Sequence, residues 1–260
     1  MNPALWVAKT GLDAQQKRLN VVSNNLANVG TNGFKRDRAV FEDLLYQNLR
    51  QPGSQSSQDT ILPSGLLLGT GVRTVATQKI HTQGAPVPTG NNLDIMIEGR
   101  GFFQILTPSG DMGYTRDGAF QVNAQGQMVT SNGYLVQPGI TIPEDAISID
   151  IGTDGTITST APGGGTTQLG VMQLADFINP AGLQAVGQNL YTETVASGAP
   201  AQGNPGLEGL GRVQSGSLEG SNVNAVEELV NMIETQRAYE MNSKAISTAD
   251  QMLAYVSQNL

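Results

Sequence analysis

PALWVAKTGLDAQQKRLNVVSNNLAN, residues 3–28, carries a repeating apolar pattern that decides how this end of the chain folds. Its main apolar residues recur at steps of three, four and seven, which places them along one face of an α-helix. A Pro at the first position suits a helix start, and the cluster Val29–Gly33 suits its end. We therefore predict a helix from Pro3 to Asn28 with one narrow buried stripe, formed by Leu5, Leu12, Leu19, Val22 and Leu26.

The other end of the chain repeats the pattern. A second helix is predicted to begin at Asn224, which can cap it, with Glu227 at the third helical position. Neither predicted helix has a helical partner nearby in the sequence, because most of the residues between them favour β structure. Each must therefore pack against the opposite end of its own chain or against neighbouring subunits. The stripe of the second helix contains Val226, Val230, Ile233, Met241 and Met252.

The residues between the two helices favour β structure. Gly makes up 32 of the 260 residues, about twice its usual share. From Leu93 onward, apolar strand-like runs alternate with turn signals such as Asp117-Gly118 and Asn132-Gly133, which supply the positive φ angles of tight hairpins. A glycine loop at residues 161–165 is expected to form an exposed tip. Before this β region, after the first helix and its turn, the short run Val40–Tyr46 is expected to continue as helix.

These patterns predict an α+β fold with a discontinuous helical domain. Residues 1–45 and 222–260 would form a paired, coiled-coil-like inner domain for assembly. Residues 76–195 would form a mainly antiparallel β domain. Residues 46–75 and 196–221 would be extended connecting arms, because they are rich in Pro, Gly and polar side chains.

Composition argues against most chemistry. The chain has no Cys and one His, His81, which excludes disulfides, thiolate nucleophiles and Cys/His zinc sites. Asp117, Asp150 and Asp154 lie beside glycines but lack the spacing of a calcium loop. No phosphate-binding or dinucleotide-binding motif is present. We therefore predict a protein that is not an enzyme and has no catalytic residues, metal or cofactor.

The charge and hydropathy of the sequence restrict the kinds of partner that are expected. Residues 1–50 contain seven Lys or Arg and four acids, whereas residues 220–260 contain two Lys or Arg and five acids, so the two ends carry +3 and −3. This complementarity would either guide pairing and register or reflect ordinary solvated helix faces. A net charge of −8 argues against nucleic acid. No secretory signal or membrane-spanning run is seen, so we expect no membrane insertion and a different export route.

Two long motifs resemble the bacterial flagellar rod and hook family. The first is NNLANVGTNGFK, residues 24–35, and the second is SNVNAVEELVNMIETQRAYEMNSK, residues 221–244. Between them, Gly101–Phe103 and Tyr114–Gly118 are similar to the start of the family's β domain. The signature residues are Asn24, Asn25, Leu26, Asn28, Gly33, Phe34, Gln236, Arg237 and Tyr239.

The resemblance implies a structural role. Members of the family are exported unfolded by the flagellar type III apparatus, and they pair their terminal helices around a central channel. The chain length, the run Phe41–Tyr46 and the arm Gln47–Ser64 are most similar to subunits of the distal section of the rod. The expected product is a helical homo-oligomer, a straight, rigid and hollow shaft across the periplasm that transmits torque to the hook.

The expected partners follow from the same resemblance. They are further copies of the chain, proximal rod proteins, the hook protein, the surrounding ring or bushing proteins and the export apparatus. The arm would bridge adjacent subunits through Arg50, Gln51, Gln55 and Gln58. Whether the arm is ordered before assembly stays open.

Other readings are possible. A proximal rod or hook subunit would have a much smaller or much larger middle domain. A secreted β-rich adhesin or wall-binding module would offer stacked aromatic residues for sugars, but the one tryptophan, Trp6, lies in the predicted first helix. A peptidoglycan hydrolase would need a defined carboxylate pair, and pairs such as Glu144-Asp145 are common in any acidic protein.

Overall fold

The structure is a computed structural model that describes residues 3–53, 55–57, 60–61 and 64–258. The chain forms two compact units. The helical unit contains Met1–Ala27, Asp37–Gln78 and Asn224–Leu260, and the β unit contains Asn28–Arg36 and Lys79–Val223. Each unit therefore combines segments that are far apart in the sequence.

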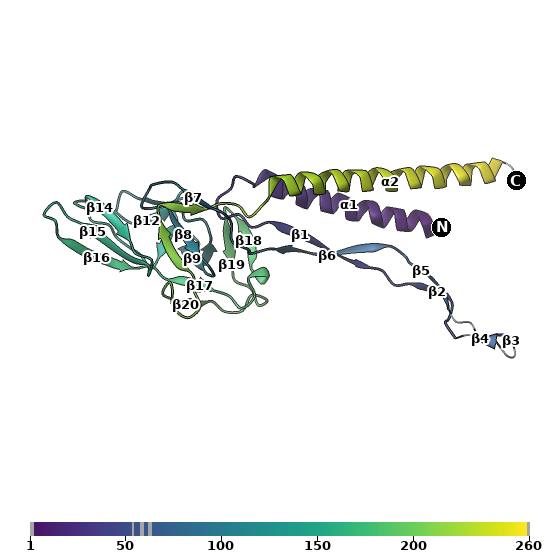
Figure 1. The fold of residues 1–260 in the computed structure, drawn as a ribbon, viewed down its shortest axis with the longest axis horizontal. Helices are drawn as coiled ribbons and strands as arrows, with labels where there is room; N and C mark the ends of the chain where they lie inside the picture. Colours follow the sequence, from purple (N-terminus) through teal and green to yellow (C-terminus); the bar gives the residue numbers. More distant parts are fainter. Residues whose placement is uncertain (1–2, 54, 58–59, 62–63, 259–260) are drawn as a thin grey trace. The chain divides into compact units, whose positions relative to one another are not determined.

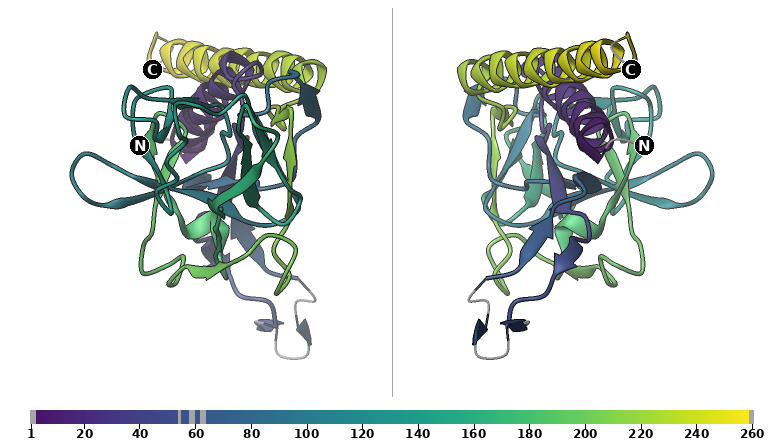
Figure 2. Two further views of the ribbon diagram at one scale, coloured as in Figure 1. Left: turned by 90° about the vertical axis from the view of Figure 1, so that its left-hand side faces the viewer. Right: turned by 90° about the vertical axis from the view of Figure 1, so that its right-hand side faces the viewer.

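Two long helices form the centre of the helical unit. α1 (Pro3–Ala27) and α2 (Ala225–Gln258) lie side by side and antiparallel, with the N- and C-termini at the same end (Figures 1 and 2). Gly11 allows the two helices to approach closely, because a Cβ there would lie 3.2 Å from the side-chain nitrogen, Nδ2, of Asn242. The Asn224 side chain accepts hydrogen bonds from the amides of Val226 and Glu227, at 3.0 and 3.4 Å. The predicted helix pair and its Asn cap are confirmed.

The rest of the helical unit is a long two-stranded hairpin. Residues 40–43 belong to its first strand, so the prediction of a continuing helix at Val40–Tyr46 was wrong. The first strand pairs with Val72–Lys79, a distant segment rich in Val and Thr, and this long-range pairing decides its structure. The strands, paired from base to tip, are β1 (Asp37–Asp43) with β6 (Val72–Lys79), β2 (Gln47–Arg50) with β5 (Leu66–Leu68), and β3 (Gln55–Ser57) with β4 (Thr60–Ile61).

The hairpin is fastened to α1 near its middle. The Thr10 hydroxyl oxygen accepts a hydrogen bond from the Val72 amide at 3.4 Å. Gly71 has a φ of +114°, and a Cβ there would meet the Thr10 side chain. At the base, the Asn25 side chain donates to the Asp37 carbonyl at 2.9 Å and accepts from the Asp37 amide at 2.8 Å. These contacts fix where β1 and β6 run along the helix.

The β unit is built around a nine-stranded sheet. Seven strands follow the order β11-β12-β13-β9-β10-β19-β18, and β17 pairs with both β9 and β20. Neighbouring strands of this sheet pair antiparallel. These strands are β9 (Phe102–Leu106), β10 (Met112–Thr115), β11 (Phe120–Val122), β12 (Met128–Thr130), β13 (Leu135–Gln137), β17 (Leu174–Asp176), β18 (Gln184–Gly187), β19 (Leu190–Thr192) and β20 (Ala201–Gly203).

Smaller sheets complete the β unit. Three strands form the order β14-β15-β16, and two pairs join β8 to β21 and β7 to β22. One 3-10 turn, η1, spans Pro180–Gly182. The α+β fold class is confirmed. The remaining strands are β7 (Pro86–Pro88), β8 (Ile95–Glu98), β14 (Ser148–Ile151), β15 (Thr156–Thr160), β16 (Thr166–Val171), β21 (Arg212–Ser215) and β22 (Ser217–Glu219).

Two of the predicted turns join neighbouring strands and one does not. Asn132-Gly133 links β12 to β13, with Gly133 at a φ of +83°. Ala161–Gly165 forms a largely exposed turn between β15 and β16, as predicted. Asp117-Gly118, however, does not close a hairpin, because β10 pairs with β9 and β19 whereas β11 pairs with β12. Local turn signals therefore found turns but not strand partners.

The core lies between the sheets of the β unit. Aliphatic side chains dominate one cluster, and edge-to-face aromatic contacts such as Tyr114 with Phe177 at 4.8 Å hold a second. Burial of this apolar surface is the main favourable term in the folding of the unit. The fully buried members of the two clusters include Ile95, Ile97, Phe102, Phe103, Ile105, Phe120, Met128, Ile157, Met172 and Phe177.

The turn that follows α1 in the sequence belongs to the β unit. The Gly33 amide donates to the Glu219 carbonyl at 2.7 Å. Its φ is +66°, and a Cβ there would lie 2.6 Å from the Asp117 nitrogen. Gly30, in the same turn, would place a Cβ in open space without a left-handed φ. Only the first of these two glycines is required by the geometry.

Gly33→Ala and Gly30→Ala should therefore differ in their effect on the β unit. The first forces a left-handed Cβ against backbone, which we expect to cost at least about 2 kcal/mol of unfolding free energy. The second should change stability by less than about 0.5 kcal/mol. Urea unfolding followed by far-UV circular dichroism measures both. Equal midpoints for the two variants would contradict this account of the turn.

Candidate assembly surfaces and a buried ion network

The residues of the stripe predicted on α1 are buried or partly buried in the helical unit. Val22 is buried, and Leu5, Leu12, Leu19 and Leu26 are partly buried. These residues behave as a packing face of the single chain.

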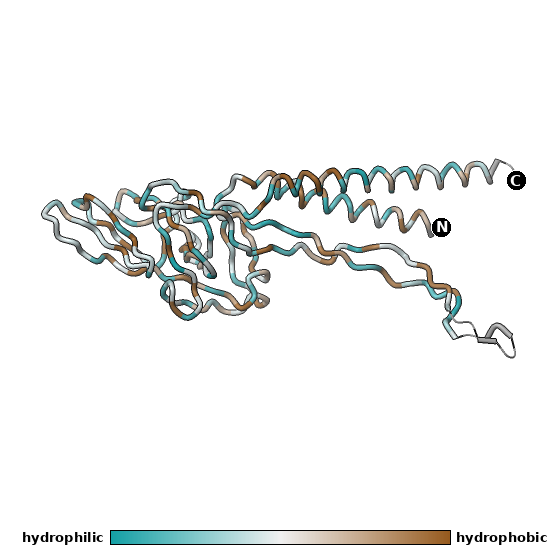
Figure 3. The backbone as a smooth tube through the Cα atoms, in the orientation of Figure 1, coloured by the Kyte–Doolittle hydropathy of each residue, from teal (hydrophilic) through white to brown (hydrophobic). Residues whose placement is uncertain are grey.

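The stripe predicted on α2 is exposed at the surface of the single chain. The exposed fractions are 70% for Val226, 50% for Val230 and Ile233, 67% for Met241 and 60% for Met252. The buried residues of α2 are instead Glu228, Thr235 and Ala249, and Met232 and Ile246 are partly buried. Figure 3 shows the apolar start of this helix followed by a hydrophilic stretch. Most of the α2 stripe is therefore at the surface of the single chain, whereas the α1 stripe is buried or partly buried.

The hairpin presents a second exposed apolar surface. Arg50 and Gln51 are exposed, Gln55 begins β3, and Gln58 lies outside the described residues. A two-stranded ribbon is marginal in water unless something packs on it. Its exposed large apolar residues are Leu45, Tyr46, Leu49, Leu66, Leu67, Leu68 and Val75.

The two sequence signatures have different roles. In the first, Asn25 is buried in the bonds to Asp37, and Asn28 accepts a hydrogen bond from the Thr31 hydroxyl at 3.1 Å. In the second, the signature residues Gln236, Arg237 and Tyr239 are exposed on α2, as Asn24 is on α1. The amino-terminal signature is therefore largely explained by folding, whereas Gln236, Arg237 and Tyr239 of the carboxy-terminal one are left at the surface.

A buried ion pair lies at the end of the first signature. Lys35 and Glu219 have fully buried side chains, and the Lys35 ammonium donates to the Glu219 carboxylate at 2.5 Å. The ammonium also donates to the Thr82 carbonyl at 2.8 Å, and the carboxylate accepts from the Gly84 amide at 2.9 Å. Burial lowers the pKa of Lys35, and the charge of Glu219 opposes that shift.

Arg116 adds a second cation to the same carboxylate. Its guanidinium lies 3.4 Å from Glu219 and donates to the Gly99 carbonyl at 2.7 Å. It also lies 5.3 Å from the centre of the Phe102 ring, in a cation–π arrangement. One buried anion thus faces two buried cations, and we call Lys35, Arg116 and Glu219 the ion network.

Asn222 ties the same segments together without charge. Its side-chain oxygen accepts from the Arg36 amide at 2.7 Å. Its side-chain nitrogen donates to the Ile80 and Thr82 carbonyls, at 2.8 and 3.1 Å. The ion pair and Asn222 therefore join three segments of the β unit through hydrogen bonds. These segments are residues 34–36, 80–84 and 217–222.

His81 lies beside this network. Its ring contacts Phe102 and Tyr191 edge to face, with centroids 5.7 and 5.9 Å apart, and both ring nitrogens are buried without a well-formed hydrogen bond. Burial, and then the positive charges of Lys35, Arg116 and Lys79, lower the pKa of His81 to about 4, against a weak opposing interaction with the Pro180 carbonyl. The imidazole is therefore neutral at neutral pH.

The motif at residues 114–118 is structural in each position. Tyr114 is in the aromatic core, the Thr115 hydroxyl donates to the Asn189 carbonyl at 2.8 Å, and Arg116 joins the ion network. Asp117 accepts from the Ala119 amide at 3.2 Å and from the Asn189 side chain at 3.1 Å. Burial raises the pKa of Asp117.

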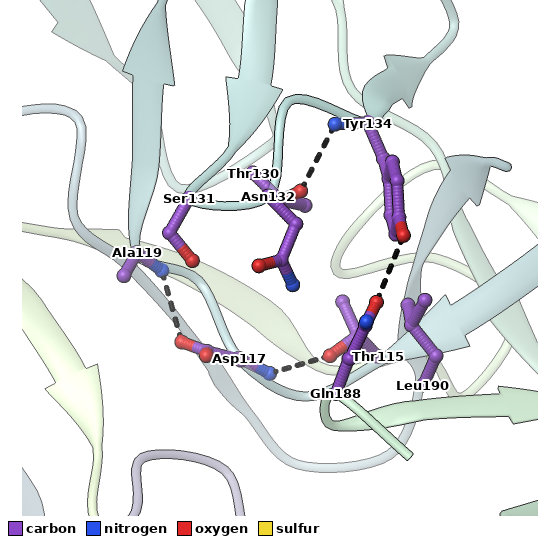
Figure 4. Close-up of a pocket in the computed structure, with 9 residues that line it drawn as sticks. All are labelled: Thr115, Asp117, Ala119, Thr130, Ser131, Asn132, Tyr134, Gln188 and Leu190. Atoms are coloured by element: carbon purple, nitrogen blue, oxygen red, sulfur yellow. Dashed lines mark hydrogen bonds between the residues drawn. The ribbon is translucent and has the colours of Figure 1, made fainter. Parts of the chain in front are cut away.

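A small polar cleft lies beside this motif (Figure 4). The hydroxyl of Tyr134 donates to the side chain of Gln188 at 2.9 Å, and Asp117 is held by the bonds to Ala119 and Asn189. Its polar groups are thus largely engaged with one another. Within the described residues, no group of three or more acidic or His side chains is placed to hold a metal ion, and neither α1 nor α2 is apolar enough over its length to cross a membrane.

Three family descriptions match separate parts of the chain. Residues 5–35 match "Flagella basal body rod protein", residues 96–159 match "Flagellar hook protein FlgE/F/G D1 domain", and residues 214–259 match "Flagellar basal body rod FlgEFG protein C-terminal". The matches fall on both helices and on the sheet between them.

Relatives match over nearly the full length. The flagellar basal-body rod protein FlgG of Buchnera aphidicola (subspecies Schizaphis graminum) is 56% identical over 99% of this chain and 100% of its own. The chain belongs to the family of the flagellar basal-body rod protein FlgG. The FlgG proteins of Caulobacter vibrioides and Bacillus subtilis are 51% and 38% identical, covering 98% and 96% of both chains.

Family membership confirms the predicted class and location. The protein is a structural, non-enzymatic subunit of the flagellar basal-body rod, and a component of the flagellar hook–basal body complex. The readings as an adhesin or a wall hydrolase are thereby set aside.

Sequence reasoning missed the ion network. The sequence shows Lys35 only as the last residue of the first motif, and nothing in it assigns a charge or amide partner to Glu219 or Asn222. The partners of Lys35 lie 47 and 184 residues away, so no local spacing reports them. The one hint in the sequence is that Lys35 ends a motif, residues 24–35, whose other residues are all uncharged.

Removing the anion of the network should cost more than removing one cation. Glu219→Gln leaves Lys35 and Arg116 buried without a counter-charge, for an expected loss of about 3–5 kcal/mol of unfolding free energy. Lys35→Met leaves Glu219 paired with Arg116 and the Gly84 amide, so its loss should be smaller. Chemical unfolding of the two variants gives the comparison. A larger loss for the Lys35 variant would contradict the assigned network.

His81 should make the β unit sensitive to acid. Its folded pKa of about 4 lies below the unfolded value near 6.5. The unfolded chain therefore binds the proton more readily, and stability present above pH 6.5 is lost as the pH falls toward 4. The loss should total about 3 kcal/mol, with a slope approaching about 1.4 kcal/mol per pH unit.

The matched control is His81→Phe, which keeps an aromatic ring beside Phe102 and cannot be protonated. The parent should lose more stability than this variant between pH 7 and pH 4.5. Because His81 is the single histidine, its ring protons give the pKa directly by NMR titration. A midpoint near 6.5 in the folded chain would refute the assignment.

Proposed function

We propose that this subunit builds the distal section of the rod, a straight, rigid and hollow shaft that crosses the periplasm and carries torque to the hook. The observation that carries the proposal is the exposed stripe of α2. Val226, Val230 and Ile233 are at least half exposed on a helix whose inner face is filled by other residues. An apolar surface of this kind on a long helix is typical of a surface that is covered by another molecule.

The contact between copies is proposed to be head-to-tail. A heterologous contact whose rotation does not close generates an open helical filament, which a rod requires. In this proposal the stripe residues Val226, Val230, Ile233, Met241 and Met252 pack against neighbouring copies. The residues on the α1 stripe act within the chain, although they stay candidates for a shared interface.

The hairpin is proposed to stiffen the shaft. Its exposed leucines offer apolar surface beyond what the helix pair covers, and both edges of the ribbon can add to a neighbour's strand. Arg50, Gln51, Gln55 and Gln58 would contribute polar contacts at its outer part. A contact repeated in every copy resists the sliding between neighbours that bending requires.

The further partners are proposed on family grounds. They are proximal rod proteins at one end, the hook protein at the other, ring or bushing proteins around the shaft, and the type III export apparatus during delivery.

Ile233→Asp tests the proposed use of α2. The side chain is half exposed in the single chain, so the change should cost the monomer less than about 1 kcal/mol. In an assembled shaft it would bury an unpaired charge, at a cost of several kcal/mol per copy. Electron microscopy should show straight tubes for the parent and none for the variant.

The control is Ser243→Asp, at an exposed position on the polar part of the same helix. It adds the same charge to α2 without touching the stripe, and its tubes should match the parent's. Normal tubes from the Ile233 variant would remove α2's stripe from the interface.

A further inference from the structure

The sequence contains two Asn-Gly pairs, and the fold places them in opposite environments. Asn132-Gly133 lies in the turn between β12 and β13, where residues 131–133 are all exposed and a Cβ on Gly133 would lie in open space. Asn32-Gly33 lies in the turn after α1, where Gly33 is buried and a Cβ on it would lie 2.6 Å from the Asp117 nitrogen.

An Asn side chain that is followed by Gly can react with the backbone. The Gly nitrogen attacks the side-chain carbonyl carbon, the new C–N bond closes a cyclic imide, and ammonia leaves with the proton of the attacking nitrogen. Water then opens the imide at either carbonyl and gives aspartate or isoaspartate. Water is the one co-reactant. Gly favours the attack because it has no side chain to hinder it and its backbone reaches more conformations.

The fold leaves Asn132 able to react. Its carboxamide points into the cleft that Asp117 also lines (Figure 4), and it forms no hydrogen bond with the residues that the structure describes. The attacking nitrogen is held by one bond within the turn, from the Gly133 amide to the Thr130 carbonyl at 2.8 Å. Exposed turns open locally at a low free energy, so this bond is readily released.

The fold holds Asn32 in place. The Gly33 amide donates to the Glu219 carbonyl at 2.7 Å, and the side chain of Glu219 is fixed in the ion network. The Asn32 carbonyl accepts from the Asn189 side chain at 3.3 Å. Release of the Gly33 nitrogen therefore requires the segments joined by the network to separate, which approaches unfolding of the β unit.

We infer that Asn132 is a modification site, at which the folded chain loses side-chain ammonia and gains a carboxylate, and that the fold protects Asn32 from the same reaction. The product adds a carboxylate to a cleft whose lining includes Asp117 and no Lys or Arg. Isoaspartate also reroutes the backbone of the β12–β13 turn through the former side chain. The inference concerns the single folded chain and does not depend on self-assembly.

Peptide mapping by mass spectrometry tests the inference on the full-length chain. After incubation in neutral buffer and digestion with chymotrypsin, the peptide that contains Asn132 should gain about 1 Da, because a hydroxyl replaces the amine. Its rate should exceed that of Asn32 at least about tenfold in the folded chain. In urea the two rates should converge, because both pairs are then exposed.

Glu219→Gln is the matched variant, because it weakens the network that holds Gly33 and leaves the β12–β13 turn untouched. It should raise the rate at Asn32 and not the rate at Asn132, with folding checked by circular dichroism. A folded parent chain in which the two Asn residues react equally fast, or equally slowly, would overturn the inference. A rate ratio as large in urea as in the folded chain would also overturn it, because neighbouring residues rather than the fold would then set the difference.

Discussion

The Lys35–Glu219 ion pair is the constraint on which the β unit depends. The chain enters and leaves this unit through residues 28–36, 79–84 and 217–223, and the ion network with Asn222 joins all three. Two fully buried charges are costly unless they are paired and hydrogen bonded. Here the pairing is available only when all three segments are in place, so the network specifies how they come together.

Several other features follow from this constraint. Gly33 must be glycine because its turn lies against the backbone of Asp117, and Asn189 bonds both Asp117 and the Asn32 carbonyl. His81 is held neutral because burial lowers its pKa, and the neighbouring cations, which outnumber the one carboxylate, lower it further. The first signature and the motif at residues 114–118 are thus two sides of one packing arrangement.

The sequence predicted the elements whose information is local. Helical spacing located α1 and α2, Asn224 marked a cap, and Asn132-Gly133 marked a hairpin. It failed where a distant partner decides, as at Val40, which is a strand because Val72–Lys79 pairs beside it. The spacing on α2 predicted an apolar face. It did not predict whether that face packs against its own chain or against another one.

The central proposal concerns that choice: α2 keeps its apolar stripe outside the single chain, and we propose that assembly covers it. Hydroxyl-radical footprinting measures this side chain by side chain, by comparing isolated chains with tubes. The account predicts that Leu229, Ile233 and Met252 are labelled in the isolated chain and protected in tubes, while the exposed β-unit residue Ile178 stays labelled in both. Equal labelling of the α2 stripe in the two states would contradict it.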